Sequence, residues 1–185
     1  MAPNQANEAV LLQDSLLDSN SAWPFLENHC GYVSEGYLVD GASCIANAGP
    51  FDDIDISVTV RQISGSVNGF YGIMLRQHDG QNAYIFDIST DGSWRFQKIT
   101  ANSFFPDTPN REIFILPTRD QYLHAGRTNT LLVRAIGGRF TFYGNNFKLG
   151  EVDDSGGYSS GGIGLVATQG ARAAFTKLLV TRPKE

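Results

Sequence analysis

This chain of 185 residues has few cysteines, no long apolar run and no block of charge of one sign. Its apolar runs are much shorter than the ~18 residues that a membrane-spanning helix needs, so we expect no membrane span. The formal net charge is −5, and acidic and basic residues are interspersed along the chain. Because this pattern lacks the basic footprint of nucleic-acid-binding proteins, we expect no nucleic-acid partner.

The opening residues, MAPNQANEAVLL, lack the basic segment and apolar core of a signal peptide. Two interpretations remain: a cytosolic protein, or a mature or truncated domain of a longer protein.

The two cysteines, Cys30 and Cys44, are the whole thiol content of the chain. Their spacing alone leaves open a disulfide or two unrelated buried thiols. A disulfide would close a loop of about 15 residues and stabilise the fold by ~3 kcal/mol in the chain-entropy model. It would also indicate an oxidising compartment.

Glycine and aromatic residues, in contrast, are abundant, with 20 Gly, 12 Phe and 7 Tyr, and hydrophobic residues make up 42% of the chain. Aromatic runs punctuated by glycine favour a β-sandwich or barrel over a helical fold. The length suits one domain, which we expect over residues 11–182 after a disordered lead-in over residues 1–10.

The clearest strand pattern runs from Phe70 to Ile99. Three apolar runs alternate with a period of two and are separated by turn signals at Asp79-Gly80 and Asp91-Gly92. One face of these runs carries large apolar residues: Tyr71, Ile73, Leu75, Tyr84, Phe86, Ile88, Trp94 and Phe96. We interpret the stretch as an antiparallel meander at the middle of a sheet.

Residues Phe51 to Val60 form another alternating strand, with Asp53 and Asp55 on the face that we expect to be wet. About twelve short strands and no convincing amphipathic helix predict an all-β, two-sheet antiparallel sandwich. We expect Trp23-Pro24-Phe25 to plug one end of the core. Ala101 to Asp120, with three prolines, is interpreted as a long surface excursion.

Several segments in this order resemble the concanavalin A-like lectin/glucanase jelly rolls. They are Phe51–Val58, Tyr71–Arg76, Asn82–Ile88, Gly92–Trp94, Leu131–Val133, Phe140–Asn145 and Ser160–Ala167. Within that superfamily the chain is most similar to bacterial extracellular domains of the keto-disaccharide hydrolase-like (DUF1080-type) group.

The resemblance implies a jelly-roll fold and an extracellular or cell-surface location in a bacterium, as part of a larger surface or secreted protein. Members of the group carry a tryptophan-proline plug and two cysteines in these places, so the resemblance implies a Cys30–Cys44 disulfide. The departure from the family is the long segment from Ala101 to Asp120.

Carboxylate pairs that could cleave glycosides are incomplete. Glu151 and Asp153 begin the Glu-x-Asp-x-Glu pattern of the superfamily's glucanases, but Ser155 stands where the second Glu belongs. Asp53 and Asp55 share a strand face, which we interpret as a solvated face. We therefore assign no catalytic residue.

Calcium is the one cofactor left open, since lectin-like jelly rolls often carry it on loop carboxylates. Its candidate ligands are Asp52, Asp53, Asp153 and Asp154.

The candidate ligand site is a face of the central meander rather than a motif. Sugars bind to aromatic rings and to a few planar polar groups. The resemblance places Arg76 near the pocket, and we group with it Tyr84, Asp87, Trp94 and Arg95. The alternative is that Tyr84 and Trp94 pack in the core and Arg76 caps a strand.

The leading hypothesis is therefore a non-catalytic, extracytoplasmic domain that binds a glycan or another small-molecule ligand. The alternatives are a glycoside-active hydrolase or lyase of the same superfamily and a cell-surface protein-interaction module.

Overall fold

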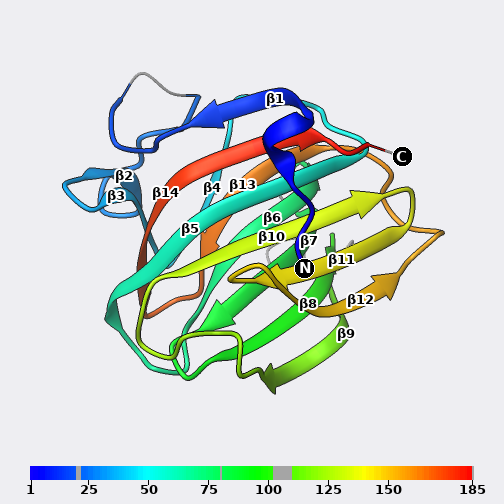
Figure 1. The fold of residues 1–185 in the computed structure, drawn as a ribbon. Helices are drawn as coiled ribbons and strands as arrows, with labels where there is room; N and C mark the ends of the chain where they lie inside the picture. Colours follow the sequence, from blue (N-terminus) through cyan, green and yellow to red (C-terminus); the bar gives the residue numbers. More distant parts are fainter. Residues whose placement is uncertain (20–21, 80, 102–109, 185) are drawn as a thin grey trace.

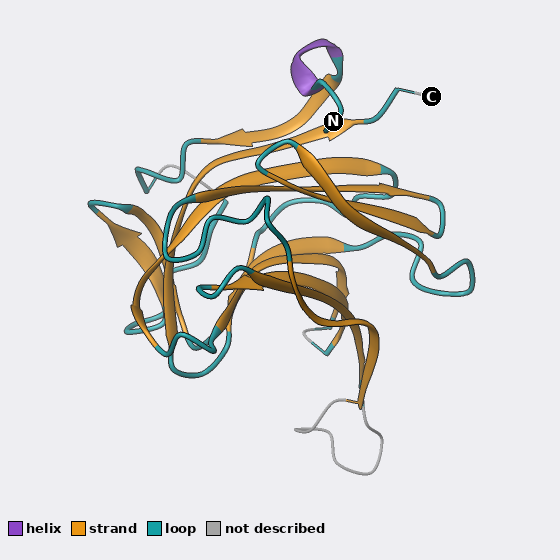
Figure 2. Ribbon diagram, turned by 60° about the horizontal axis from the view of Figure 1, so that its bottom comes forward, coloured by secondary structure: helices purple, strands orange, loops and turns teal. Residues whose placement is uncertain are grey.

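The chain folds as a sandwich of two antiparallel sheets in the computed structural model, which describes residues 1–19, 22–79, 81–101 and 110–184 (Figure 1). The described residues form fourteen strands and one short 3-10 turn, η1 (Gln5–Asn7). Figure 2 shows the sheets as two layers, with the six-stranded sheet below. The predicted all-β jelly-roll sandwich is confirmed.

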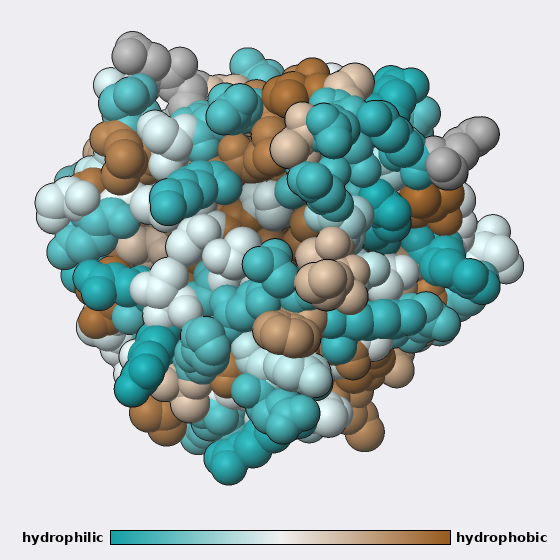
Figure 3. Space-filling model, viewed as in Figure 1, coloured by the Kyte–Doolittle hydropathy of each residue, from teal (hydrophilic) through white to brown (hydrophobic). Residues whose placement is uncertain are grey.

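The larger sheet has eight strands. Seven of them follow the order β12 (Phe147–Asp153), β11 (Arg139–Gly144), β10 (Asn129–Ile136), β5 (Ile54–Gly65), β14 (Ala171–Arg182), β3 (Gly36–Asp40) and β2 (Cys30–Val33). The eighth strand, β1 (Ala9–Asp14), pairs with β14. The outer face of this sheet is mostly polar, with scattered small apolar patches (Figure 3).

The smaller sheet has six strands. Their order is β4 (Ser43–Ile45), β13 (Gly162–Ala167), β6 (Phe70–His78), β7 (Asn82–Ser89), β8 (Ser93–Thr100) and β9 (Asn110–Arg119). The predicted meander is therefore confirmed as β6-β7-β8, which lies inside this sheet. Every apolar residue that the period-of-two pattern assigned to one face lies in the main core.

Asparagine turns help to define the strand register. Asn145 and Asn146, between β11 and β12, both have positive φ, at 50° and 72°. Two consecutive residues with positive φ characterise the type I′ turn, which matches the twist of a hairpin. The Asn145 side chain donates to the Tyr122 carbonyl at 2.7 Å and accepts from the Thr130 backbone N–H at 2.9 Å. The predicted hairpin turn therefore also connects β10 to the loop that precedes it, through the Asn145 side chain.

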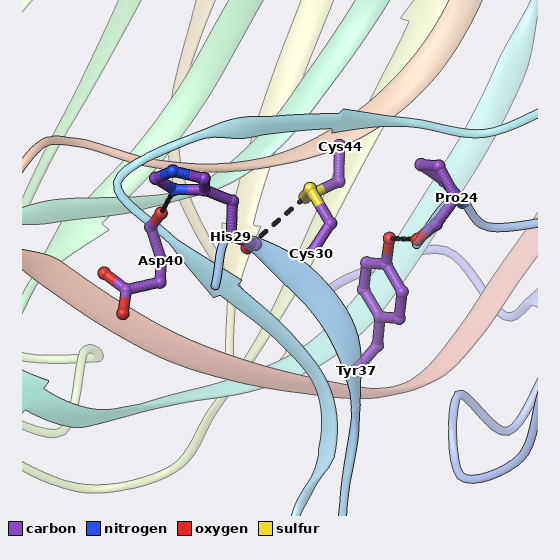
Figure 4. The surroundings of a disulfide bond; sticks show 6 residues. All are labelled: Pro24, His29, Cys30, Tyr37, Asp40 and Cys44. Atoms are coloured by element: carbon purple, nitrogen blue, oxygen red, sulfur yellow. Dashed lines mark hydrogen bonds between the residues drawn. A yellow bond between two sulfur atoms is a disulfide. The ribbon is translucent and has the colours of Figure 1, made fainter. Parts of the chain in front are cut away.

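A disulfide joins Cys30 on β2 to Cys44 on β4 and so links an edge of one sheet to an edge of the other (Figure 4). The predicted pairing is confirmed. Beside it the Tyr37 hydroxyl donates to the Pro24 carbonyl at 2.5 Å, and the rings of Trp23 and Tyr37 lie 5.4 Å apart. Of the predicted plug, Trp23 is buried whereas Phe25 is exposed.

The segment from Ala101 to Asp120 was wrongly interpreted as a surface excursion throughout. Residues 110–119 form β9, which pairs with β8 at the edge of the sheet. Pro117, which has no backbone N–H, is tolerated because the β8–β9 pairing shifts register between Trp94 and Phe96. This part of β9 forms a bulge, where the backbone makes no regular ladder hydrogen bond. The other two prolines, at 106 and 109, lie outside the described residues.

The amino terminus also differs from its prediction as a disordered lead-in. Residues 5–7 form η1, and the Glu8 carboxylate pairs with Arg134 at 3.0 Å. Asp55, expected on a wet face, is fully buried and accepts three hydrogen bonds from Arg134. The Gln5 amide bonds to the Asp55 backbone carbonyl, so η1 covers the polar face of β5.

A single domain over residues 11–182 stays a prediction.

We expect removal of the disulfide to lower stability without changing the fold. A Cys30→Ala/Cys44→Ala variant should lose ~3 kcal/mol of unfolding free energy in urea, because the unfolded chain regains the entropy of an open loop. Wild-type protein reduced with dithiothreitol is the matched control and should show a similar loss. Equal stability of the oxidised protein and the variant would contradict the prediction.

Asp91, in the turn between β7 and β8, should give stability a specific pH dependence. Hydrogen bonds from the Ser89 hydroxyl, the Ser93 backbone N–H and Arg119 lower its pKa from 3.8 to about 2. Because the folded-state pKa is depressed, the carboxylate stabilises the fold above pH ~4, and this contribution is lost as the pH falls toward 2.

The measurement is urea unfolding of wild type and Asp91→Asn between pH 6 and pH 2. We expect the variant to be less stable at pH 6 and the difference to shrink below pH 4. Asn68→Ala, which changes an exposed turn residue that does not titrate, is the control and should leave the pH dependence of stability as in the wild type. A difference between wild type and Asp91→Asn that is constant with pH would refute the assignment.

Candidate functional site

The outer face of the six-stranded sheet carries a polar pocket. Alternate residues of β7 and β8 point away from the core, so Asp87 pairs across the strands with Arg95, and Ile85 with Gln97. These four residues line a cavity of about 400 Å³ together with Arg111 on β9, the end of β13 and the turn that leads into β4. The pocket therefore lies over the meander, on the side opposite the core.

Asp87 and Arg95 form a closed ion pair at the base of this pocket. Arg95 donates through Nε to Oδ1 of Asp87 at 2.8 Å and through a terminal nitrogen to Oδ2 at 3.0 Å. Its guanidinium also lies over the Phe70 ring, 3.9 Å from the centroid. Bidentate geometry of this kind is the strong form of a charge-assisted hydrogen bond. The pair is thus a rigid feature of the pocket.

The environment of Asp87 is almost dry, with 1% of the residue exposed. Burial raises the pKa of Asp87, and the charges of Arg95 and Arg111 act against that shift. Gly72 on β6 allows this close packing, because a Cβ there would lie 3.0 Å from the Cβ of Asp87. The opposing effect of Arg111 on the pKa of Asp87 places its guanidinium near the same carboxylate.

Gln97 is the unusual residue of the site. It is 2% exposed, and its Nε2 has no hydrogen-bond partner in the described part of the chain. A buried amide donor without a partner costs ~1–3 kcal/mol, so native proteins rarely leave one unpaired without a reason. Because Gln97 lines the pocket, a ligand acceptor could complete this bond.

Apolar residues adjoin the polar group on the same outer face. They form a second, smaller hydrophobic cluster: Ile45, Met74, Ala83, Ile85, Ile99 and Val166. The pocket thus combines an apolar floor with a few convergent polar groups, which is the usual composition of a small-ligand site.

Of the predicted ligand residues, the structure brings Asp87 and Arg95 together and separates the rest from them. Tyr84 and Trp94 lie in the core, which corrects their placement on the ligand face. Trp94 packs on Phe86 and Phe142. The physical reason is parity, since even-numbered positions on β7 and β8 point inward and odd-numbered positions outward.

Arg76 is also buried, with 2% of the residue exposed, and it does not line the pocket. Its Nη1 donates to the carbonyls of Gly137 and Tyr158, each at 2.7 Å, and its guanidinium lies over the Phe140 ring. Burial lowers the pKa of Arg76, and the neighbouring Tyr84 and Asp53 oppose that shift. Arg76 is a connector between β6 and two loops.

Three of the four aspartates proposed for calcium have protein partners for their carboxylates. Asp53 accepts from the Gly137 backbone N–H, Asp153 lies 4.0 Å from Arg139, and Asp154 accepts from Tyr84 and Lys98. Asp52 contributes its backbone carbonyl to Arg76. Within the described residues, no three His, Cys, Asp or Glu side chains group in a way that could hold a metal ion.

Gln97 and Arg111 were missed by the sequence analysis. Gln97 shares its outward parity with Arg95, so the alternation of β8 could have placed it on the same face. Arg111 could not have been found this way, because the strand that carries it was interpreted as part of a surface excursion.

Comparison with known proteins supports the fold. No family model and no curated protein matches the chain. Among solved structures, the carbohydrate-binding module CBM66 from Bacillus subtilis is 19% identical, with a TM-score of 0.71, and covers 89% of this chain and 99% of its own. A Bacillus licheniformis β-glucanase has a TM-score of 0.65 at 10% identity and covers 96% of this chain and 100% of its own.

A third structure, a protein of unknown function with a galectin-like fold from Bacillus subtilis, is 15% identical with a TM-score of 0.65 and covers 95% of this chain and 97% of its own. At these identities the likeness establishes the fold, a concanavalin A-like or galectin-like sandwich. The narrower keto-disaccharide hydrolase-like resemblance stays a prediction. The described residues contain no helix that is long and apolar enough to cross a membrane.

The position of Arg76 predicts a structural role. Arg76→Ala should lower the unfolding free energy by about 3 kcal/mol, because two buried carbonyls lose a charged donor. Urea unfolding measures this, with Arg61→Ala, an exposed arginine on β5, as the control that should change stability little. A fully stable Arg76→Ala variant would contradict the connector role.

Proposed function

We propose that this protein is a non-catalytic, extracytoplasmic carbohydrate-binding domain, and that its site is the pocket of Asp87, Arg95, Gln97 and Arg111. The observation that carries the proposal is the buried amide of Gln97, which lacks a partner in the described structure and lines a pocket beside a rigid ion pair. Sugar hydroxyls supply the acceptors that such a donor needs.

Binding is favoured over catalysis by the state of the carboxylates. Glycoside cleavage ordinarily uses two carboxyl groups that flank the scissile bond. Among the described residues that line the pocket, Asp87 is the single acidic side chain, and Arg95 occupies both of its oxygens. Glu151 and Asp153 are exposed on β12, in the other sheet, where Glu151 pairs with Lys148.

The structural neighbours and the disulfide add support of a different kind. One neighbour is a carbohydrate-binding module and another a β-glucanase, so sugar-related proteins share this sandwich. A disulfide between Cys30 and Cys44 is typical of an oxidising, extracytoplasmic location. Attachment to a larger surface or secreted protein is part of the same proposal.

Gln97→Leu provides the sharpest test. The substitution removes an unpaired buried amide and keeps similar volume, so the melting temperature should stay the same or rise. Binding of a glycan identified on an array should fall at least tenfold by calorimetry. Gln13→Leu, on β1 of the other sheet, is the matched control and should leave binding unchanged.

Three outcomes would overturn the proposal: no binder on a broad glycan array, unchanged affinity in Gln97→Leu, or release of reducing sugar from the bound glycan by the wild-type protein.

A further inference from the structure

The charge of the pocket points to the class of sugar that it takes. Three charged residues line it within the described structure: Asp87, Arg95 and Arg111. Two guanidinium groups and one carboxylate leave an excess of one positive charge. The whole chain, in contrast, has a formal net charge of −5. A locally positive pocket on an acidic protein is unlike its surroundings.

The excess charge resides on Arg111. Arg95 is engaged with both oxygens of Asp87, at 2.8 and 3.0 Å. Arg111 is exposed on the edge strand β9, and its side chain forms no ion pair or hydrogen bond with the residues that the structure describes. Its guanidinium therefore retains its donors for a ligand. Arg111 lines the same cavity as Asp87, so its charge lies within reach of a ligand there.

Gln97 supplies a second, independent donor to the same cavity. It pairs across the strands with Ile113, and Arg111 pairs with Ile99, so the two polar residues lie on neighbouring strands two positions apart in register. The Gln97 amide is buried without a partner, and the Arg111 fork is at the rim. Both groups donate hydrogen bonds. Asp87, the one acidic side chain among the described residues that line the pocket, is already paired with Arg95.

We infer that the pocket binds a glycan that carries a carboxylate, such as a uronic acid, in preference to a neutral sugar; the inference rests on the proposed function. A carboxylate accepts hydrogen bonds through two oxygens in one plane, and this geometry matches the guanidinium fork of Arg111. Both carboxylate oxygens accept from the Arg111 fork, and a ring or hydroxyl oxygen of the sugar accepts from the Gln97 amide. The apolar floor of Ile85 and Val166 receives the C–H surface of the ring.

The test uses matched pairs of oligosaccharides that differ only in charge. Oligomers of galacturonate, glucuronate and mannuronate are compared by calorimetry with their methyl esters, which keep the ring but lose the negative charge. We expect at least one acid to bind tenfold or more tightly than its ester. The affinity for the acid should weaken as NaCl increases, whereas that for the ester should not.

Variants assign the preference to one side chain. Arg111→Gln should reduce binding of the acid at least tenfold, leave binding of the ester unchanged and leave the melting temperature unchanged because Arg111 is exposed. Arg111→Lys, which keeps the charge but loses the fork, should recover part of the preference. Arg127→Gln makes the same change in net charge outside the pocket and should have no effect.

The failures can be told apart. If a neutral glycan binds, Gln97→Leu abolishes that binding and Arg111→Gln has no effect, the proposed function stands and the inference about charge is wrong. If no acidic or neutral glycan binds, both are wrong. Tighter binding of a sulfated galactan oligosaccharide than of every uronate would also overturn the assignment to a carboxylate.

Discussion

The contact on which this structure depends is the aromatic packing between the two sheets. Phe96 on β8 lies 4.5 Å from Phe142 on β11, and Tyr84 on β7 lies 4.6 Å from Phe140, measured between ring centroids. Rings of this size dominate the apolar area that a sandwich buries. Because successive strand residues point to opposite faces, burying these rings places Asp87, Arg95 and Gln97 on the outer face. The core thus decides the composition of the pocket.

Buried polar groups in this fold divide into two kinds. Arg76 and Asp55 are enclosed among protein partners, since Arg76 donates through Nη1 to two loop carbonyls, although its Nε has no partner among the described residues, and Asp55 accepts from Arg134. They join strands and loops, and their burial is consistent with structure alone. Gln97 is enclosed without a partner among the described residues, and it lines a cavity. An unpaired donor that lines a cavity, rather than burial itself, separates a candidate ligand-binding residue from a structural polar residue.

The pocket differs from the usual aromatic platform for sugars. In the described structure it is lined by small and aliphatic residues, an ion pair, uncharged polar side chains and an exposed guanidinium, and the Phe70 ring lies beneath Arg95. Recognition would therefore depend on hydrogen-bond geometry and charge more than on stacking. Such a site discriminates between ligands through the groups that it leaves unpaired when the wrong ligand enters.

Local patterns in the sequence were sufficient for the sandwich, the central meander, the Asn145-Asn146 turn and the inward residues of β6, β7 and β8. Alternation and turn chemistry are properties of a few neighbouring residues, so they can be interpreted without coordinates. The same alternation on β7 and β8 already places Tyr84 and Trp94 on one face of the sheet and Asp87 and Arg95 on the other. The tertiary structure alone decided the rest: that η1 covers Asp55, that β9 pairs at the edge with Pro117 in a bulge, and that Arg111 joins Gln97 at one pocket. Each of these depends on contacts between segments far apart in the chain, and no local pattern encodes which distant partner a polar group or an edge strand will find.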